Sequence, residues 1–181
     1  GKIMATLDGS QPNTFVSVGL GQIRSIKVNI VGEAVAPGTY TLSSLATLFN
    51  ALYAAGGVND IGSLRNIKVY RNSKEIASLD VYDYLLNGKY ETNIRLEDND
   101  MIIIGPYEQL VTAGGKVKRD RTYELRRGET LADLLDMAGG FTGDAYTGSI
   151  RVKRKDGDRY KIATVNEEQF QTFVLQDGDS L

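Results

Sequence analysis

The chain contains one ordered set of residues twice, and this internal repeat limits its possible folds more than any other feature. The repeated positions are Tyr40, Ala55-Gly56-Gly57, Ile67-x-Val69-x-Arg71 and Asp98-x-Asp100, matched by Tyr123, Ala138-Gly139-Gly140, Ile150-x-Val152-x-Arg154 and Asp177-x-Asp179. Tyr40 and Tyr123 are 83 residues apart, but Asp100 and Asp179 only 79, so one connection is shorter in the second copy. The sequence therefore predicts a duplicated domain.

Hydrophobic periodicity predicts the first elements of each copy. Ile26, Val28 and Ile30 alternate with polar residues, which is typical of a half-buried strand. Pro37-Gly38 predicts a turn, because proline fixes φ and glycine accepts positive φ. The β-favouring run 39–42 then returns as a second strand.

A helix is expected next, ended in both copies by a glycine pair. Ser43 or Ser44 is the expected N-cap in the first copy, and Thr130 or an earlier residue in the second. The apolar faces at helical spacing comprise Leu45, Leu48, Phe49 and Leu52 in the first copy and Leu131, Leu134, Leu135 and Ala138 in the second. Gly56-Gly57 and Gly139-Gly140 follow these faces, so we expect Gly56 and Gly139 to end the helices with positive φ.

The sequence after the main helix predicts further strands and a short second helix in the first copy. A strand at 67–71 turns into a hairpin at Asn72-Ser73, a short helix spans 81–86, and Asp98-Asn99-Asp100 leads into a final strand at 101–104. This order predicts an α+β fold of two tandem β-grasp domains, each a mixed sheet packed on one main helix. We place the domains at 25–105 and 106–181, with 1–24 forming an N-terminal β-hairpin or extension.

Composition excludes several classes of site. The chain has no His and no Cys, which excludes Ser-His-Asp triads, thiol nucleophiles and the usual zinc sites. The paired acids at 98/100 and 177/179 lack the further ligands of a calcium loop, and we interpret them as turn residues. We therefore expect no catalytic, metal-binding or cofactor-binding residue and no cofactor. The net charge of −2 argues against a nucleic-acid-binding domain.

A basic cluster in the second copy is the candidate binding surface. We expect Lys116, Lys118, Arg119 and Arg121 in its first strands, and Arg151 and Lys153 in its third, with alternation placing Lys116, Lys118, Arg151 and Lys153 on one exposed face. Two interpretations remain open. The cluster is either a solvated face balanced by Glu129, Asp133 and Asp136, or a contact surface for an anionic polymer, acidic polysaccharide first.

These residues resemble a known domain family. The run through Pro37-Gly38-x-Tyr40, Ala55-Gly56-Gly57, Arg71 and Asp98-x-Asp100 is similar to the soluble-ligand-binding β-grasp (SLBB) domain. Two such domains in tandem resemble part of the outer-membrane polysaccharide export proteins of capsule and exopolysaccharide translocons. The second copy departs from the pattern where Arg119-Asp120 replaces Pro37-Gly38. Because the chain begins Gly1-Lys2, we expect a segment of a longer protein.

The resemblance implies a function. It implies a non-catalytic structural and binding module in the periplasm, associated with the outer membrane through other parts of its parent. It also implies weak contact with polysaccharide, self-association into a ring and an inner-membrane export partner, with no nucleic acid. An SLBB-type DNA-binding module of a competence-like envelope protein is the alternative. A carboxylate-based glycosidase ranks third, since it requires two acids across a cleft.

Overall fold

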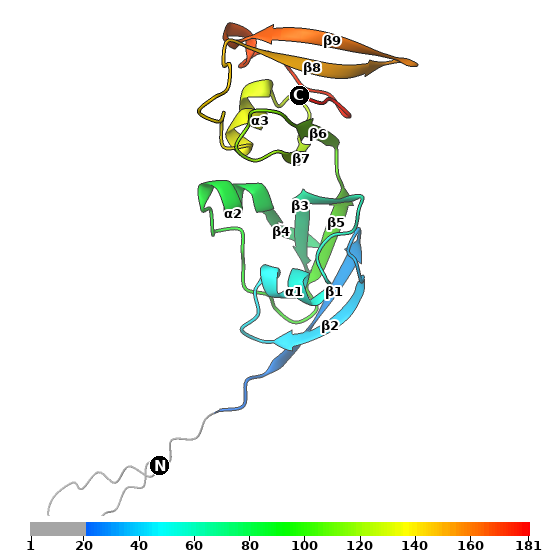
Figure 1. Cartoon of the computed structure of the whole chain (residues 1–181). Helices are drawn as coiled ribbons and strands as arrows, with labels where there is room; N and C mark the ends of the chain where they lie inside the picture. Colours follow the sequence, from blue (N-terminus) through cyan, green and yellow to red (C-terminus); the bar gives the residue numbers. More distant parts are fainter. Residues whose placement is uncertain (1–20) are drawn as a thin grey trace, which may run out of the picture.

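The protein, seen here as a computed structural model that describes residues 21–181, consists of two units lying end to end (Figure 1). Each unit has its own hydrophobic core, one built from residues between Ile26 and Ile104 and one from residues between Val111 and Leu175. The N-terminal hairpin or extension expected at 1–24 lies outside the described residues, except for 21–24, which belong to no helix or strand. The domain limits 25–105 and 106–181 stay a prediction.

The first unit is built on a five-stranded mixed sheet. Its strands are β1 (Ser25–Gly32), β2 (Gly38–Ser43), β3 (Gly62–Arg71), β4 (Lys74–Leu79) and β5 (Met101–Pro106), in the spatial order β2-β1-β5-β3-β4. The central pair β1 and β5 runs parallel and the other pairs are antiparallel. The alternating apolar residues of β1 are buried, as the sequence predicts. This is the expected β-grasp arrangement.

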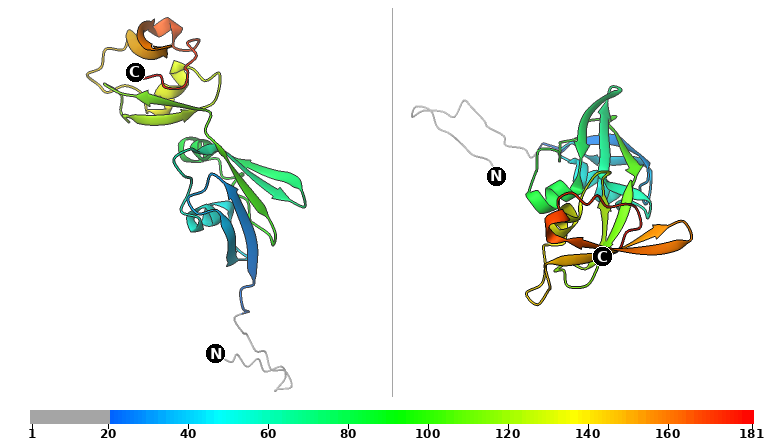
Figure 2. Two further views of the ribbon diagram at one scale, coloured as in Figure 1. Left: turned by 90° about the vertical axis from the view of Figure 1, so that its right-hand side faces the viewer. Right: turned by 90° about the horizontal axis from the view of Figure 1, so that it is seen from above.

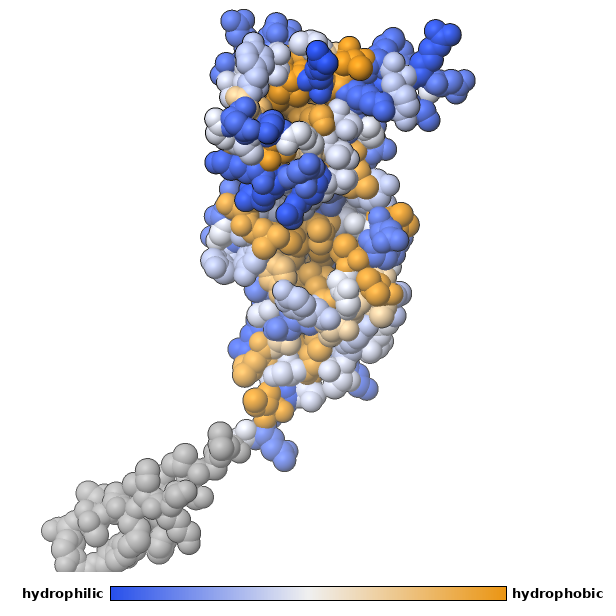
Figure 3. Space-filling model, in the orientation of Figure 1, coloured by the Kyte–Doolittle hydropathy of each residue, from blue (hydrophilic) through white to orange (hydrophobic). Residues whose placement is uncertain are grey.

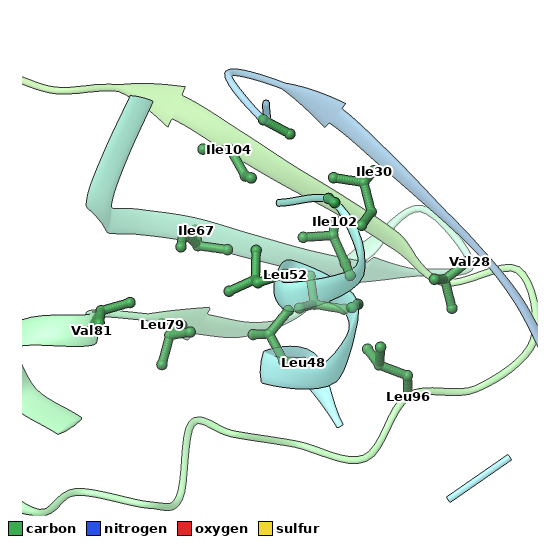
Figure 4. Packing of buried hydrophobic residues seen from close by; sticks show 14 of the residues in the cluster. Val28, Ile30, Leu48, Leu52, Ile67, Leu79, Val81, Leu96, Ile102 and Ile104 are labelled. Atoms are coloured by element: carbon green, nitrogen blue, oxygen red, sulfur yellow. The ribbon is translucent and has the colours of Figure 1, made fainter. Parts of the chain in front are cut away.

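Helix α1 (Leu48–Ala54) covers this sheet and closes the first core (Figure 4). Leu48 and Leu52 point from the helix towards Ile30 and Ile102 of the central strands, and all four side chains are buried. Burial of one such side chain contributes about 1.5–3 kcal/mol. The side chains that are fully buried on both layers therefore fix the helix on the sheet.

The start of α1 differs from the sequence prediction. Thr47 is the N-cap, and its backbone N–H donates to Asn50 Oδ1 at 2.8 Å. Ser43 instead ends β2, where its hydroxyl accepts the N–H of Leu45 in a turn. Leu45, expected on the apolar face, is therefore 56% exposed. The expected cap of the second copy, Thr130, is confirmed.

Both main helices end at their glycine pairs. Gly56 and Gly139 have φ of 76° and 79°, and Gly57 and Gly140 also have positive φ. The N–H of Gly57 donates to the carbonyl of Leu52 at 2.9 Å, which is the 6→1 bond of a Schellman cap. The glycine pair that was predicted after each helix therefore supplies N–H donors to carbonyl groups at the helix end. Pro37 directly precedes β2, and Gly38 is its first residue.

The second unit repeats this plan, with its strands paired as two separate hairpins. It comprises β6 (Gln109–Ala113), β7 (Arg121–Leu125), α3 (Leu131–Met137), β8 (Ser149–Asp156), β9 (Arg159–Asn166) and a 3-10 turn (Glu167–Gln169). Ser180 bridges Thr112 of β6 in parallel and Lys153 of β8 in antiparallel orientation, as Met101 does between β1 and β3. The spatial order of the first unit is thus kept. Where the second unit has the 3-10 turn, the first has helix α2 (Val81–Asn87).

Candidate functional site

The repeated arginine and aspartate of each unit form a buried clamp. Arg71 at the end of β3 donates to both carboxylate oxygens of Asp100, at 2.8 Å each, and Asp100 is fully buried. Arg154 and Asp179 form the same pair in the second unit, with a shortest distance of 2.6 Å. The hydrogen bond to Asp100 raises the pKa of Arg71. These carboxylates hold the turn before the last strand, so the interpretation of the paired acids as turn residues is confirmed.

A second set of charges joins the two units. Arg65 of β3 is 7% exposed and donates to Asp80, the N-cap of α2, at 3.0 Å. Across the junction, its guanidinium donates to the two carboxylate oxygens of Glu129 at 2.6 and 2.8 Å. Burial lowers the pKa of Arg65, but the carboxylates of Glu129 and Asp80 raise it by more, so the net direction is upward. The guanidinium is therefore held charged at the centre of the junction.

Glu124 of β7 binds the first unit directly. Its carboxylate accepts the backbone N–H of Leu64 at 2.8 Å and the hydroxyl of Ser63. Its own N–H donates to the phenol of Tyr82 on α2 at 2.8 Å. Burial, the main cause, raises the pKa of Tyr82. Two charged side chains and a phenol thus bond across the junction in defined directions, which sets the orientation of one unit on the other.

Sequence reasoning missed this junction, although a signal was present. Arg65 occupies an inward position of β3, two residues before the buried Ile67, where a charged side chain requires a buried partner. The repeat supplies a second signal, since Arg65, Glu124 and Glu129 correspond at the offset of 83 to Gly148, Thr41 and Ala46. Charged residues that only one copy carries indicate contacts between the copies.

Two of the candidate polymer contacts lie outside the strands in which they were expected. Lys116 and Lys118 belong to the loop between β6 and β7, because β6 ends at Ala113 and Gly115 has φ of 80°. Lys116 forms an exposed ion pair with Asp144 at 2.5 Å. Lys118 is exposed in the same loop. The prediction that these lysines share a strand face with Arg151 and Lys153 was therefore wrong.

The other four candidates are divided between two surfaces. Arg119 also lies in the loop, and its guanidinium donates to the carbonyl of Met137 at the end of α3, at 2.9 Å. Arg121 begins β7 and is exposed. Arg151 and Lys153 lie on one exposed face of β8, on either side of the buried Val152. Lys116 and Arg151 line one shallow pocket, whereas Arg119 and Arg121 line another. Arg151 and Lys153 are the pair that alternation placed correctly on one strand face.

Two of the three acids expected to balance this charge, Glu129 and Asp133, are engaged elsewhere. Glu129 binds Arg65, and Asp133 accepts the N–H of Thr130 at 2.7 Å in the cap of α3.

Among residues 21–181, no three His, Cys, Asp or Glu side chains are grouped so that they could hold a metal ion. Within the same range, none of the helices combines the length and the apolar character needed to cross a membrane.

Comparison with known proteins identifies both units. Models of the SLBB domain match residues 26–104 and 110–163. Two curated sequences of the polysialic acid transport protein KpsD of Escherichia coli are each 30% identical over 173 residues, covering 94% of this chain and 30% of the relative. The chain thus spans less than a third of the length of these relatives. The repeat, the two β-grasp units and the two matches agree, and the chain belongs to the SLBB domain family, with two SLBB domains in tandem.

Proposed function

We propose that these domains are a non-catalytic periplasmic module of a polysaccharide export protein, which associates with the outer membrane through other parts of the parent. The observation that carries the proposal is the tandem pair of SLBB domains, similar along almost its whole length to a polysialic acid transport protein. The chemistry of the site agrees, because its best-buried carboxylates bind arginines within the fold. The module binds and positions; it breaks no bond.

The junction supports a structural role. Arg65, Glu124 and Glu129 join the two domains through buried hydrogen bonds of fixed direction. A buried, fully paired charge set tolerates only one geometry, because any rotation leaves a charge unpaired in a poorly solvated place. Two domains locked in this way form a rigid rod. In the parent, we propose that copies of this rod assemble into a ring and contact an inner-membrane export partner.

Loss of the parent gene tests this function. Cells that lack the gene are expected to lose surface polysaccharide and to retain the polymer inside the envelope, and a plasmid copy of the parent restores export. Surface and total polysaccharide are measured by chemical assay of intact and lysed cells. Normal surface polysaccharide in the deletion strain, or a defect in DNA uptake instead, would contradict the proposal.

A further inference from the structure

The hairpin β8–β9 has two different faces. Val152 and Val165 point into the second core, whereas Arg151, Lys153 and Lys155 on β8 are all exposed. Their cross-strand partners on β9 are Thr164, Ile162 and Tyr160. Because opposite residues of an antiparallel pair share a face, these six side chains form one solvent-exposed surface, which we name the outer face of the hairpin. The hairpin extends beyond the body of the domain in Figure 1 and in the right-hand view of Figure 2.

The outer face concentrates positive charge. The 18 residues from Ser149 to Asn166 include six Lys and Arg against two Asp, in a chain of net charge −2. Arg151, Lys153 and Lys155 follow one another at about 6.6 Å along the strand. None of the three forms a salt bridge within the described part of the chain, whereas Arg154 and Lys161 on the inner side do. Hydrophilic residues dominate this projection in the space-filling view (Figure 3).

An apolar strip accompanies the cations. Tyr160 and Ile162 are 61% and 68% exposed on β9. The ammonium of Lys153 lies 4.2 Å from the centre of the Tyr160 ring. A row of cations on β8 beside an exposed ring on β9 provides both an electrostatic contact for an anion and a flat surface for an apolar ring face.

The fold itself does not require this surface. In the first domain the positions equivalent to Arg151, Lys153 and Lys155 are Lys68, Tyr70 and Asn72. Lys68 is neutralised by Glu75 at 3.2 Å. The first domain therefore builds the same hairpin on the same kind of core without a row of unpaired cations. A feature that one copy has and the other lacks is available for a function of its own.

We propose that the outer face of β8–β9 is a contact site for an anionic sugar polymer. This proposal rests on the proposed export function. The row of cations matches carboxylates that recur along such a polymer, and the Tyr160 ring packs on the apolar CH face of a sugar ring. A transported polymer must leave each site as readily as it arrives, and exposed, solvated cations give weak contacts of this kind. Many copies in one assembly would hold the chain by avidity.

Binding of defined polymers to the purified chain tests the site. The probes are an oligomer of sialic acid, neutral dextran, and single-stranded and duplex DNA, measured by calorimetry or fluorescence anisotropy at low and physiological salt. The test variant is R151Q/K153Q/K155Q. The matched control, K27Q/K68Q/K74Q, removes the same charge from the first domain, at two exposed positions and one half-buried position.

We expect the test variant to bind the sialic acid oligomer about tenfold more weakly at low salt, and the slope of log K against log salt to fall by about two. The control variant and Y160F should change affinity less than twofold, and Y160A should weaken it at both salt concentrations. Equal losses in test and control variants, tighter binding of DNA than of the oligomer, or no binding by the unchanged chain would each overturn the inference.

Export by cells separates the two proposals. If a parent protein with R151Q/K153Q/K155Q exports normally while the gene deletion abolishes export, the outer face is not a polymer site but the export function stands. If the deletion strain exports normally, the export function itself fails. Reduced export by the triple variant, at wild-type abundance and assembly, is the result that we expect.

Discussion

Arg65 in the first domain and Glu129 in the second meet at the junction through two hydrogen bonds of 2.6 and 2.8 Å. The same guanidinium also binds Asp80 beside it, so one side chain joins the start of α2 to the second domain. The relative orientation of the two domains therefore depends on a few buried polar groups rather than on an extensive shared core.

Removal of the central charge should destabilise the protein and loosen the junction. For Arg65→Met we expect a loss of about 3 kcal/mol in the free energy of unfolding, because Glu129 loses its ion-pair partner and the buried Asp80 keeps only the half-exposed Arg126. The measurement is urea denaturation followed by circular dichroism, with small-angle scattering for the interdomain orientation. Lys68→Met, which breaks the exposed pair with Glu75, is the control and should cost less than about 1 kcal/mol. Equal effects would contradict the account.

The buried clamp of each domain predicts a difference between neighbouring aspartates. Asp100→Asn should lower the free energy of unfolding by about 3 kcal/mol, because Asp100 is buried and accepts hydrogen bonds from Nε and Nη2 of Arg71. Asp98→Asn should cost less than about 1 kcal/mol, since Asp98 accepts an N–H at the surface. Thermal and urea denaturation of both variants provide the comparison. A larger effect at Asp98 would show that the clamp does not stabilise the domain.

The helix caps predict a backbone effect. Gly56 has φ of 76°, which a β-branched residue adopts only with strain, and an added Cβ would lie 3.4 Å from Val35. Gly56→Val is therefore expected to destabilise the first domain by about 1 kcal/mol or more. Gly143→Ala is the control, because an added Cβ there meets nothing within 4 Å. A melting temperature that is unchanged by Gly56→Val would refute the cap assignment.

The junction also predicts a dependence of stability on alkaline pH. Burial raises the pKa of Tyr82, so above about pH 10 the unfolded chain releases this phenolic proton while the folded chain keeps it. The stability that Tyr82 contributes is present below pH 10 and is lost as pH rises towards its higher folded pKa. The destabilisation caused by Tyr82→Phe at pH 7 should therefore shrink above pH 10. Equal destabilisation by Tyr82→Phe at pH 7 and above pH 10 would contradict the assignment.

Much of the fold could be predicted from sequence because the repeat shows the same pattern of residues twice. Alternation at Ile26, Val28 and Ile30 and the glycine pairs identified strand and cap without any tertiary information. The start of α1 was placed at Ser43 or Ser44 from local capping preference alone. The repeat would have corrected it, since Thr130 in the second copy corresponds to Thr47, the observed cap.

The candidate site was harder to predict because contacts between distant residues decide it. Strand alternation placed Lys116 and Lys118 on one face with Arg151 and Lys153, but the break at Gly115 places the first two in a loop. The partner of Arg65 is 64 residues away in the sequence and belongs to the other domain. Local patterns carry no information about which charges meet across such a junction.

Photo-crosslinking in exporting cells tests most directly whether these domains contact the polymer. A photoreactive amino acid is placed at position 160 or 162 on the outer face of the second hairpin, and at position 27 on the exposed surface of β1 as a control, in the full-length parent. We predict light-dependent attachment of polysaccharide from positions 160 and 162 only, and only while export is active. Efficient crosslinking from position 27 alone, or none from any position in cells that export normally, would contradict the account.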